Sequence, residues 1–240
     1  MGKQTFAAII LSAGKGTRMN SDVPKQYLAL DGKPALYYSL LAFQRSMISR
    51  VVLVAGQEDV GYCKQEIVEK YGLDKVEAVV AGGKERYHSV FCGLSYLAGK
   101  DPAPDYVMIH DGARPLLDDG MIVRCAEAVR EFQACAAGMP VKDTVKIADR
   151  ESFAVETPDR SRVWQIQTPQ AFAFPLIYQA YQKLLEQEAG GKKLRVTDDA
   201  MVLEAMGQGK VKLVEGSYEN IKITTPEDLE VAQMFLERRK

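Results

Sequence analysis

Short apolar runs alternate with longer amphipathic stretches along the first 140 residues, and this alternation constrains the fold more than any other feature. The short runs are rich in β-branched residues, which is typical of buried strands. The longer stretches carry apolar residues at helical spacings of three and four. This alternation predicts an α/β fold with a doubly wound, mostly parallel, Rossmann-like sheet and helices on both faces. We expect strands at 6–11, 51–55, 76–80, 106–109 and 134–141, and helices at 35–45, 58–71, 89–97 and 119–132.

The pattern changes between residues 142 and 167. Two short extended pieces, 145–147 and 153–155, flank a polar turn, which predicts a hairpin that projects from the sheet. Further on we expect helices at 175–188 and 198–206, strands at 211–214 and 221–224, and a last helix that starts at Thr225-Pro226. Because no repeat or linker is recognisable, residues 1–240 are predicted to form a single domain with a β-arm at about 142–167.

The composition limits which partners and which cellular compartment are expected. The formal net charge is −1 and no Lys/Arg-rich run occurs, so neither a nucleic acid polymer nor a membrane surface is an expected partner. The apolar runs are too short to cross a bilayer. The four cysteines form no CxxC pair and no metal-ligand spacing with His88 or His110, which favours free thiols and a cytoplasmic location.

The loop after the first strand, Leu-Ser-Ala-Gly-Lys-Gly-Thr-Arg-Met at 11–19, is suited to phosphate binding. Its small residues let the backbone approach a ligand, and consecutive amides can point at anionic oxygens. It matches neither the Walker A loop nor the Rossmann glycine fingerprint, so an NAD-dependent oxidoreductase is disfavoured. Arg18 in the loop and Lys25 shortly after it would suit a polyphosphate, although both could also be solvated surface cations.

This loop, together with Pro24-Lys-Gln, resembles the signature of nucleotidyltransferases that make nucleoside-diphosphate sugars and alcohols. Later motifs are similar, in order and approximate spacing, to those of the 2-C-methyl-D-erythritol 4-phosphate cytidylyltransferase family over essentially the whole chain. They are His110-Asp-Gly-Ala-Arg-Pro115, Lys142-Asp-Thr144, Thr157-Pro-Asp-Arg160, Gln167-Thr-Pro-Gln170, Thr197-Asp-Asp199 and Asn220-Ile-Lys-Ile-Thr224.

The resemblance implies a reaction. CMP would pass from CTP to 2-C-methyl-D-erythritol 4-phosphate, which gives 4-diphosphocytidyl-2-C-methyl-D-erythritol and pyrophosphate in non-mevalonate isoprenoid biosynthesis. Since the nucleophile is a substrate phosphate oxygen, the protein need not supply one, and catalysis would rest on positioning and on cations. The resemblance also implies a homodimer whose β-arm completes a shared active site.

The resemblance further assigns roles by position. Arg18, Lys25, Arg160 and Lys222 would be catalytic cations, and Asp111 would hold Mg²⁺ or another divalent cation. The nucleotide would contact Ala13, Gly14, Gly16, Gly82, Gly83, Ser89 and Asp111, and the polyol phosphate would contact Thr144, Arg160, Thr168, Thr197 and Asp199.

For several of these residues a purely structural or solvent-exposed position is an alternative to a functional role. Lys222 could lie on the solvent face of an edge strand, and Asp111 could form a turn. Thr197 and Asp199 could cap the helix that follows them. Arg114 could be structural or could contact a ligand.

Two other functions also remain. One is cytidylylation of ribitol 5-phosphate, and the other is a non-catalytic nucleotide-binding regulator on the same fold.

Overall fold

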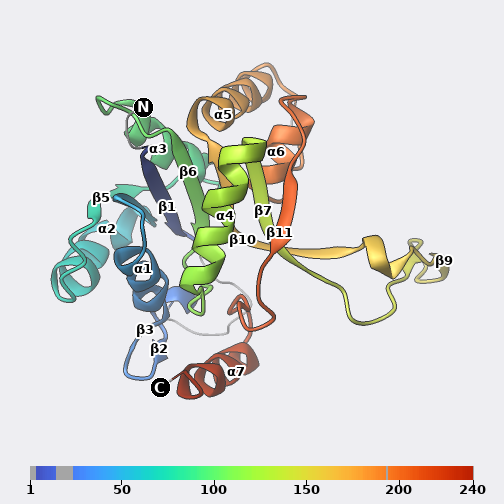
Figure 1. Cartoon of the computed structure of the whole chain (residues 1–240), viewed down its shortest axis with the longest axis horizontal. Coiled ribbons are helices and arrows are strands. Elements are labelled where there is room, and N and C mark those ends of the chain that lie inside the picture. The colour runs from blue at the N-terminus through green and yellow to red at the C-terminus, as the bar shows by residue number, and fades with distance from the viewer. Residues whose placement is uncertain (1–3, 15–23, 193, 240) are drawn as a thin grey trace.

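A seven-stranded, mostly parallel sheet forms the centre of the protein (Figure 1). The computed structural model of the chain describes residues 4–14, 24–192 and 194–239. The strand order is β11-β7-β10-β6-β1-β4-β5, and only β10 runs antiparallel to its neighbours within this sheet. The predicted fold class is thereby confirmed. The strands are β1 (Phe6–Ser12), β4 (Arg50–Ala55), β5 (Val76–Ala81), β6 (Tyr106–Asp111), β7 (Ala134–Pro140), β10 (Trp164–Ala173) and β11 (Lys212–Glu215).

Helices cover both faces of this sheet, which explains why its strands are apolar on both sides. Alternate residues of β1 point in opposite directions: Phe6, Ala8 and Ile10 join one buried cluster, and Ala7 and Ile9 join the other. The first cluster packs under α1 (Ala35–Arg45) and α4 (Asp119–Phe132). The second packs under α3 (Arg86–Ala98), α5 (Phe174–Ala189) and α6 (Asp199–Ala205).

Prediction and structure differ at three places. The ten-residue strand β10 was not predicted. Residues 221–224 were predicted as a strand but lie outside the sheet, where the Ile223 amide donates to the Ala113 carbonyl (2.9 Å). The predicted helix 58–71 is present as a continuous helical segment but is not a regular α-helix: a 3-10 turn at Gln57–Asp59 is followed by α2 (Val60–Tyr62) and a π-helix at Cys63–Glu69.

The predicted hairpin is present and leaves the body of the protein as an arm (Figure 1). It consists of β8 (Ile147–Ala148) and β9 (Ala154–Glu156), which pair antiparallel, followed by the 3-10 turn η4 (Arg160–Arg162). The chain returns to the sheet through β10.

The C-terminal helix α7 (Pro226–Glu237) begins with a capping box between Thr225 and Asp228 and packs near the first residues of α1. The remaining short elements are the 3-10 turn η1 (Lys25–Tyr27) and the pair β2 (Ala29–Leu30) and β3 (Lys33–Pro34). Within the described part of the chain, none of the helices combines the length and apolar character that a bilayer crossing needs.

Candidate active site

Two cavities meet at the carboxyl ends of β1 and β6, the edge where doubly wound sheets bind ligands. The larger has a volume of about 590 Å³, and the smaller about 260 Å³. Arg86, Asp111 and Lys222 line both cavities and therefore stand at their junction. The larger cavity is also lined by Leu11, Ser12, Ala13, Gly14, Lys25, Gln26, Gly83, Lys84, Glu85, Ser89 and Ala113, and the smaller by Arg114, Ile166, Gln167, Thr168, Gln170, Thr197 and Asp198.

The Gln26 side chain connects the turn η1 to the end of β1. Its side-chain amide, only 3% exposed, donates to the Ser12 carbonyl (2.7 Å) and to the Gly14 carbonyl (3.2 Å). The turn that contains Gln26 also carries Lys25, so the same contact sets where Lys25 stands relative to the end of β1. Sequence reasoning missed Gln26, although it is part of the quoted Pro-Lys-Gln motif.

Gly82 and Gly83 bring the backbone close to the larger cavity because no side chain fits there. A Cβ on Gly82 would lie 2.7 Å from both the Ala13 Cβ and the Ser89 Oγ. A Cβ on Gly83 would overlap the His88 side chain. The Gly83 amide donates to Ser89 Oγ (3.1 Å), so the first turn of α3 fixes this wall.

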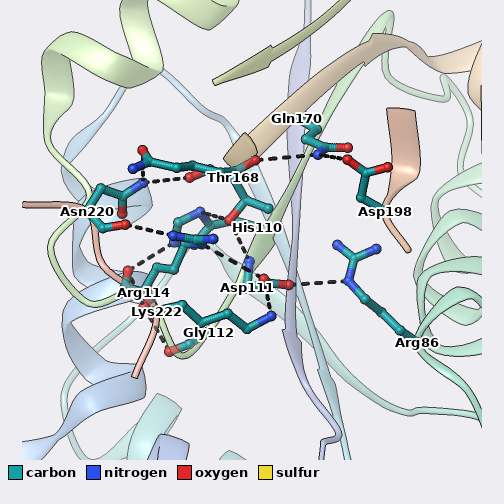
Figure 2. A network of polar contacts seen from close by, with 12 residues as sticks. Arg86, His110, Asp111, Gly112, Arg114, Thr168, Gln170, Asp198, Asn220 and Lys222 are labelled. Atoms are coloured by element: carbon teal, nitrogen blue, oxygen red, sulfur yellow. Dashed lines mark hydrogen bonds and ion pairs between the residues drawn. The ribbon is translucent and has the colours of Figure 1, made fainter. Parts of the chain in front are cut away.

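Asp111, 8% exposed, ends β6 and is surrounded by cations (Figure 2). Lys222 Nζ lies 2.7 Å from Oδ2, Arg86 Nε lies 3.4 Å from Oδ1, and Arg114 Nε lies 3.9 Å from Oδ2. Burial by itself would raise the pKa of Asp111, but Arg86, Lys222 and Arg114 outweigh it and hold this pKa well below its usual range. The carboxylate is therefore ionised at neutral pH.

A chain of hydrogen bonds fixes the backbone of Asp111 from behind (Figure 2). His110 Nε2 lies 3.1 Å from the Arg114 carbonyl, which can only accept, so Nε2 carries the proton. Nδ1 is then the acceptor for the Thr168 hydroxyl (3.0 Å), and the Asp111 amide donates to the same Thr168 oxygen (3.1 Å). Burial lowers the pKa of His110 to about 4, which keeps the ring neutral.

Arg86 is held from the opposite side by Asp199. Its Nη1 and Nη2 donate to the two carboxylate oxygens of Asp199 at 2.8 and 2.7 Å. Asp199 is fully buried and also accepts a hydrogen bond of 2.5 Å from the Tyr181 hydroxyl. Arg86 thus connects a buried carboxylate with the one at the cavity junction.

Comparison with known proteins decides the family. The family model for 2-C-methyl-D-erythritol 4-phosphate cytidylyltransferase matches residues 6–238. The chain belongs to this family. A cytidylyltransferase of that name from Lachnospira eligens is 48% identical over 230 residues, which cover 95% of this chain and 98% of the relative. One from Caldanaerobacter subterraneus is 46% identical over 97% of this chain and 99% of the relative.

Solved structures agree with this family assignment. The 4-diphosphocytidyl-2C-methyl-D-erythritol synthase of Anaerococcus prevotii superposes with a TM-score of 0.83 at 34% identity and covers 98% of this chain and 99% of that one. The Francisella tularensis cytidylyltransferase gives a TM-score of 0.77 at 28% identity and covers 96% of this chain and 99% of that one. The predicted family, its α/β fold and its enzyme class, a nucleotidyltransferase, are confirmed.

The structure gathers most of the residues expected of a cytidylyltransferase site. Gly16 and Arg18 lie outside the described residues. Gly82 adjoins the larger cavity through Ala13 and Ser89. The others that face the two cavities are Ala13, Gly14, Lys25, Gly83, Ser89, Asp111, Thr168, Thr197 and Lys222.

Besides Gly82, three of the expected site residues that the structure describes line neither cavity. Asp199 is fully buried and both of its oxygens accept hydrogen bonds from Arg86, so it is not among the residues that line the two cavities. Thr144 and Arg160 are exposed on the arm and are not among the residues that line the two cavities. Arg160 donates to the Lys142 carbonyl (2.8 Å) at the base of the arm.

Arg114, left open by the sequence, has a structural partner. Its Nη1 donates to the Asn220 carbonyl (2.7 Å), which fixes the segment that carries Lys222. Asn220 in turn donates to the Thr168 carbonyl (2.9 Å). Arg114 therefore links two motifs that are 106 residues apart in the sequence.

Proposed function

We propose that this chain transfers CMP from CTP to 2-C-methyl-D-erythritol 4-phosphate, with release of pyrophosphate. The observation that carries this proposal is the meeting of the two cavities at Arg86, Asp111 and Lys222. The larger cavity, lined by Ala13, Gly14 and Gly83, suits the nucleotide. The smaller one suits the polyol phosphate. The two phosphorus centres that react would then meet at the junction.

The reaction requires that the substrate phosphate approach the α-phosphate of CTP and that their negative charge be compensated. It does not require a nucleophile from the protein. An oxygen of the substrate phosphate forms a bond to the α-phosphorus of CTP while the bond from that phosphorus to the oxygen bridging to the β-phosphate breaks. The electron pair leaves with pyrophosphate. Lys222 at the junction and Lys25 at the larger cavity would stabilise the negative charge on the reacting groups.

We assign the divalent cation to Asp111. Mg²⁺ prefers hard oxygen ligands and is commonly held by one or two carboxylates plus substrate phosphates. Asp111 is an ionised carboxylate at the cavity junction and fits that role. Among the described residues there is no cluster of three or more His, Cys, Asp or Glu side chains that could hold a metal, so phosphate oxygens would complete the coordination. Bound there, the cation would neutralise phosphate charge and orient the triphosphate.

We also propose that the active site is shared between two copies of the chain. The arm exposes large apolar side chains: Ile147 is 46% exposed, Phe153 67% and Val155 62%. A two-stranded hairpin is marginally stable in water without a surface to pack against. The arm carries Thr144 and Arg160 and extends away from its own sheet (Figure 1). A two-fold partner would cover the apolar side chains and receive Arg160 at its own junction.

The substrate assignment is tested with purified protein, CTP and Mg²⁺, together with either 2-C-methyl-D-erythritol 4-phosphate or ribitol 5-phosphate. We expect pyrophosphate release with the first acceptor at least a hundredfold faster than with the second, and loss of turnover in EDTA. Faster turnover with ribitol 5-phosphate would overturn the acceptor. Full activity in EDTA would overturn the metal role, and no turnover with either acceptor would overturn the reaction.

A further inference from the structure

Arg86 connects the cavity junction to a buried pair behind it. The two terminal nitrogens of its guanidinium are used by Asp199, at 2.8 and 2.7 Å, and its Nε lies 3.4 Å from Asp111. A guanidinium has five N–H donors, so two remain after the contacts with Asp199 and Asp111. The Arg86 side chain is 29% exposed, and it lines both cavities.

The pair behind Arg86 is fully enclosed. Asp199 begins α6 and Tyr181 lies within α5, and both are 0% exposed. The Tyr181 hydroxyl donates to the same Asp199 oxygen that accepts from Arg86 Nη1. This contact limits how the carboxylate can rotate, and the bidentate pair then limits how the guanidinium can rotate.

Stability alone does not account for such a buried ion pair. A buried salt bridge often contributes no more to stability than apolar residues of the same size, because both charges must be removed from water. What this arrangement provides is a fixed direction for one cation at the place where two phosphates would meet. Arginine suits this task since one edge of its planar group can bind a carboxylate while another edge binds phosphate.

We propose that Tyr181 and Asp199 are positioning residues that hold Arg86 at the junction, where Arg86 binds a phosphate group of the reactants. This inference rests on the proposed function. Asp199 thereby affects the reaction through Arg86 without touching substrate. The alternative is that Tyr181 and Asp199 only brace α5 and α6 against the sheet.

A double-mutant cycle separates the two roles. Asp199→Asn alone is expected to lower kcat/KM by about a hundredfold, the lower end of what loss of one preorganised contact costs. Tyr181→Phe is expected to lower it about tenfold. In an Arg86→Ala background, Asp199→Asn should change kcat/KM less than threefold, because the residue that it positions is already gone.

Chemical rescue provides a second readout that a bracing role would not affect. Added guanidinium should restore part of the activity of Arg86→Ala, at least fivefold at its optimum. Added guanidinium should not restore the activity of the Arg86→Ala, Asp199→Asn double variant, because that variant lacks the carboxylate that would bind guanidinium. Tyr178→Phe is the matched control, since Tyr178 lies on the same helix and packs by ring stacking on Phe91 and Phe174. It should stay within twofold of the parent protein.

The parent protein is assayed with the same substrates, so failure of the positioning role can be distinguished from failure of the proposed reaction. If the parent turns over and Asp199→Asn costs the same in both backgrounds, the positioning role is overturned while the reaction stands. Should Asp199→Asn fail to fold, Tyr181→Phe replaces it in the cycle and is judged by the same criterion. Equal rescue of the single and double variants would also refute the inference.

Discussion

The buried neutral state of His110 makes the stability of the protein depend on pH. His110 is 0% exposed, and burial lowers its pKa from 6.5 to about 4. In the unfolded chain the ring returns to about 6.5. Between these two values the unfolded state binds more protons than the folded state, so stability falls as the pH falls. The full difference corresponds to about 3 kcal/mol, of which about 2 kcal/mol is lost between pH 7.5 and pH 5.

Comparison with His110→Gln isolates this contribution. The glutamine amide can still donate toward the Arg114 carbonyl but has no proton to gain in this pH range. Urea unfolding of both proteins at pH 7.5 and pH 5 gives two changes in the free energy of unfolding. We expect the parent protein to lose about 2 kcal/mol more than the variant. Taking the difference between the two proteins removes the contribution of the groups that they share. An equal loss in both proteins would refute the assignment of a neutral, buried His110.

Two further predictions concern the cations. Lys25→Ala should lower kcat/KM by a hundredfold to a thousandfold with an unchanged circular dichroism spectrum, roughly the cost of one preorganised contact, and near-parental turnover would remove Lys25 from the mechanism. Equal amounts of Lys25→Ala and Arg160→Ala subunits, mixed and allowed to exchange, should recover about a quarter of the parental activity, since half of the dimers are mixed and each has one intact site. A mixture that exchanges subunits but stays inactive would exclude a shared site.

The central strands were predictable because both of their faces are buried. Strands β1 and β4 contain short apolar runs rich in aliphatic residues, a pattern and length that favour buried strands. Strand β10 was missed because its middle, Gln167-Thr-Pro-Gln170, is polar and contains proline, although Thr168 and Gln170 are buried there. Their polar atoms are used by His110 and by Asp198, contacts that residues far away in sequence supply.

The segment 221–224 shows the opposite error. Its alternation of Ile221, Lys222 and Ile223 is typical of a strand, but the isoleucines pack near α7 while the lysine reaches Asp111. Local pattern cannot tell a sheet edge from a segment that packs on a helix, because both bury every second residue. The role predicted for Lys222 therefore rests on the family resemblance and not on the alternation.

Asp199 illustrates what a motif cannot specify. The resemblance marks it as functional, yet the side chain points into the protein, where Arg86, 113 residues away in sequence, meets it. Arg86 stands in the segment Gly82-Gly-Lys-Glu-Arg86, but nothing local distinguishes it from the nearby Lys84. Which of the two cations faces inward depends on the first turn of α3, and that is a tertiary property.

The charges at the junction explain how a protein of net charge −1 can bring two phosphate groups together. Two like unit charges about 5 Å apart repel by about 3 kcal/mol at an intermediate effective dielectric, and phosphates with more than one charge repel more strongly. Arg86, Arg114 and Lys222 surround the Asp111 carboxylate, and among the described residues the only other carboxylate paired with these cations is Asp199, which binds Arg86. Three positive against two negative charges leave an excess of one positive charge, before Lys25 is counted. Because Asp111 and Asp199 are buried, they hold these partly exposed cations where the phosphates would meet, and the rest of the surface can remain nearly neutral.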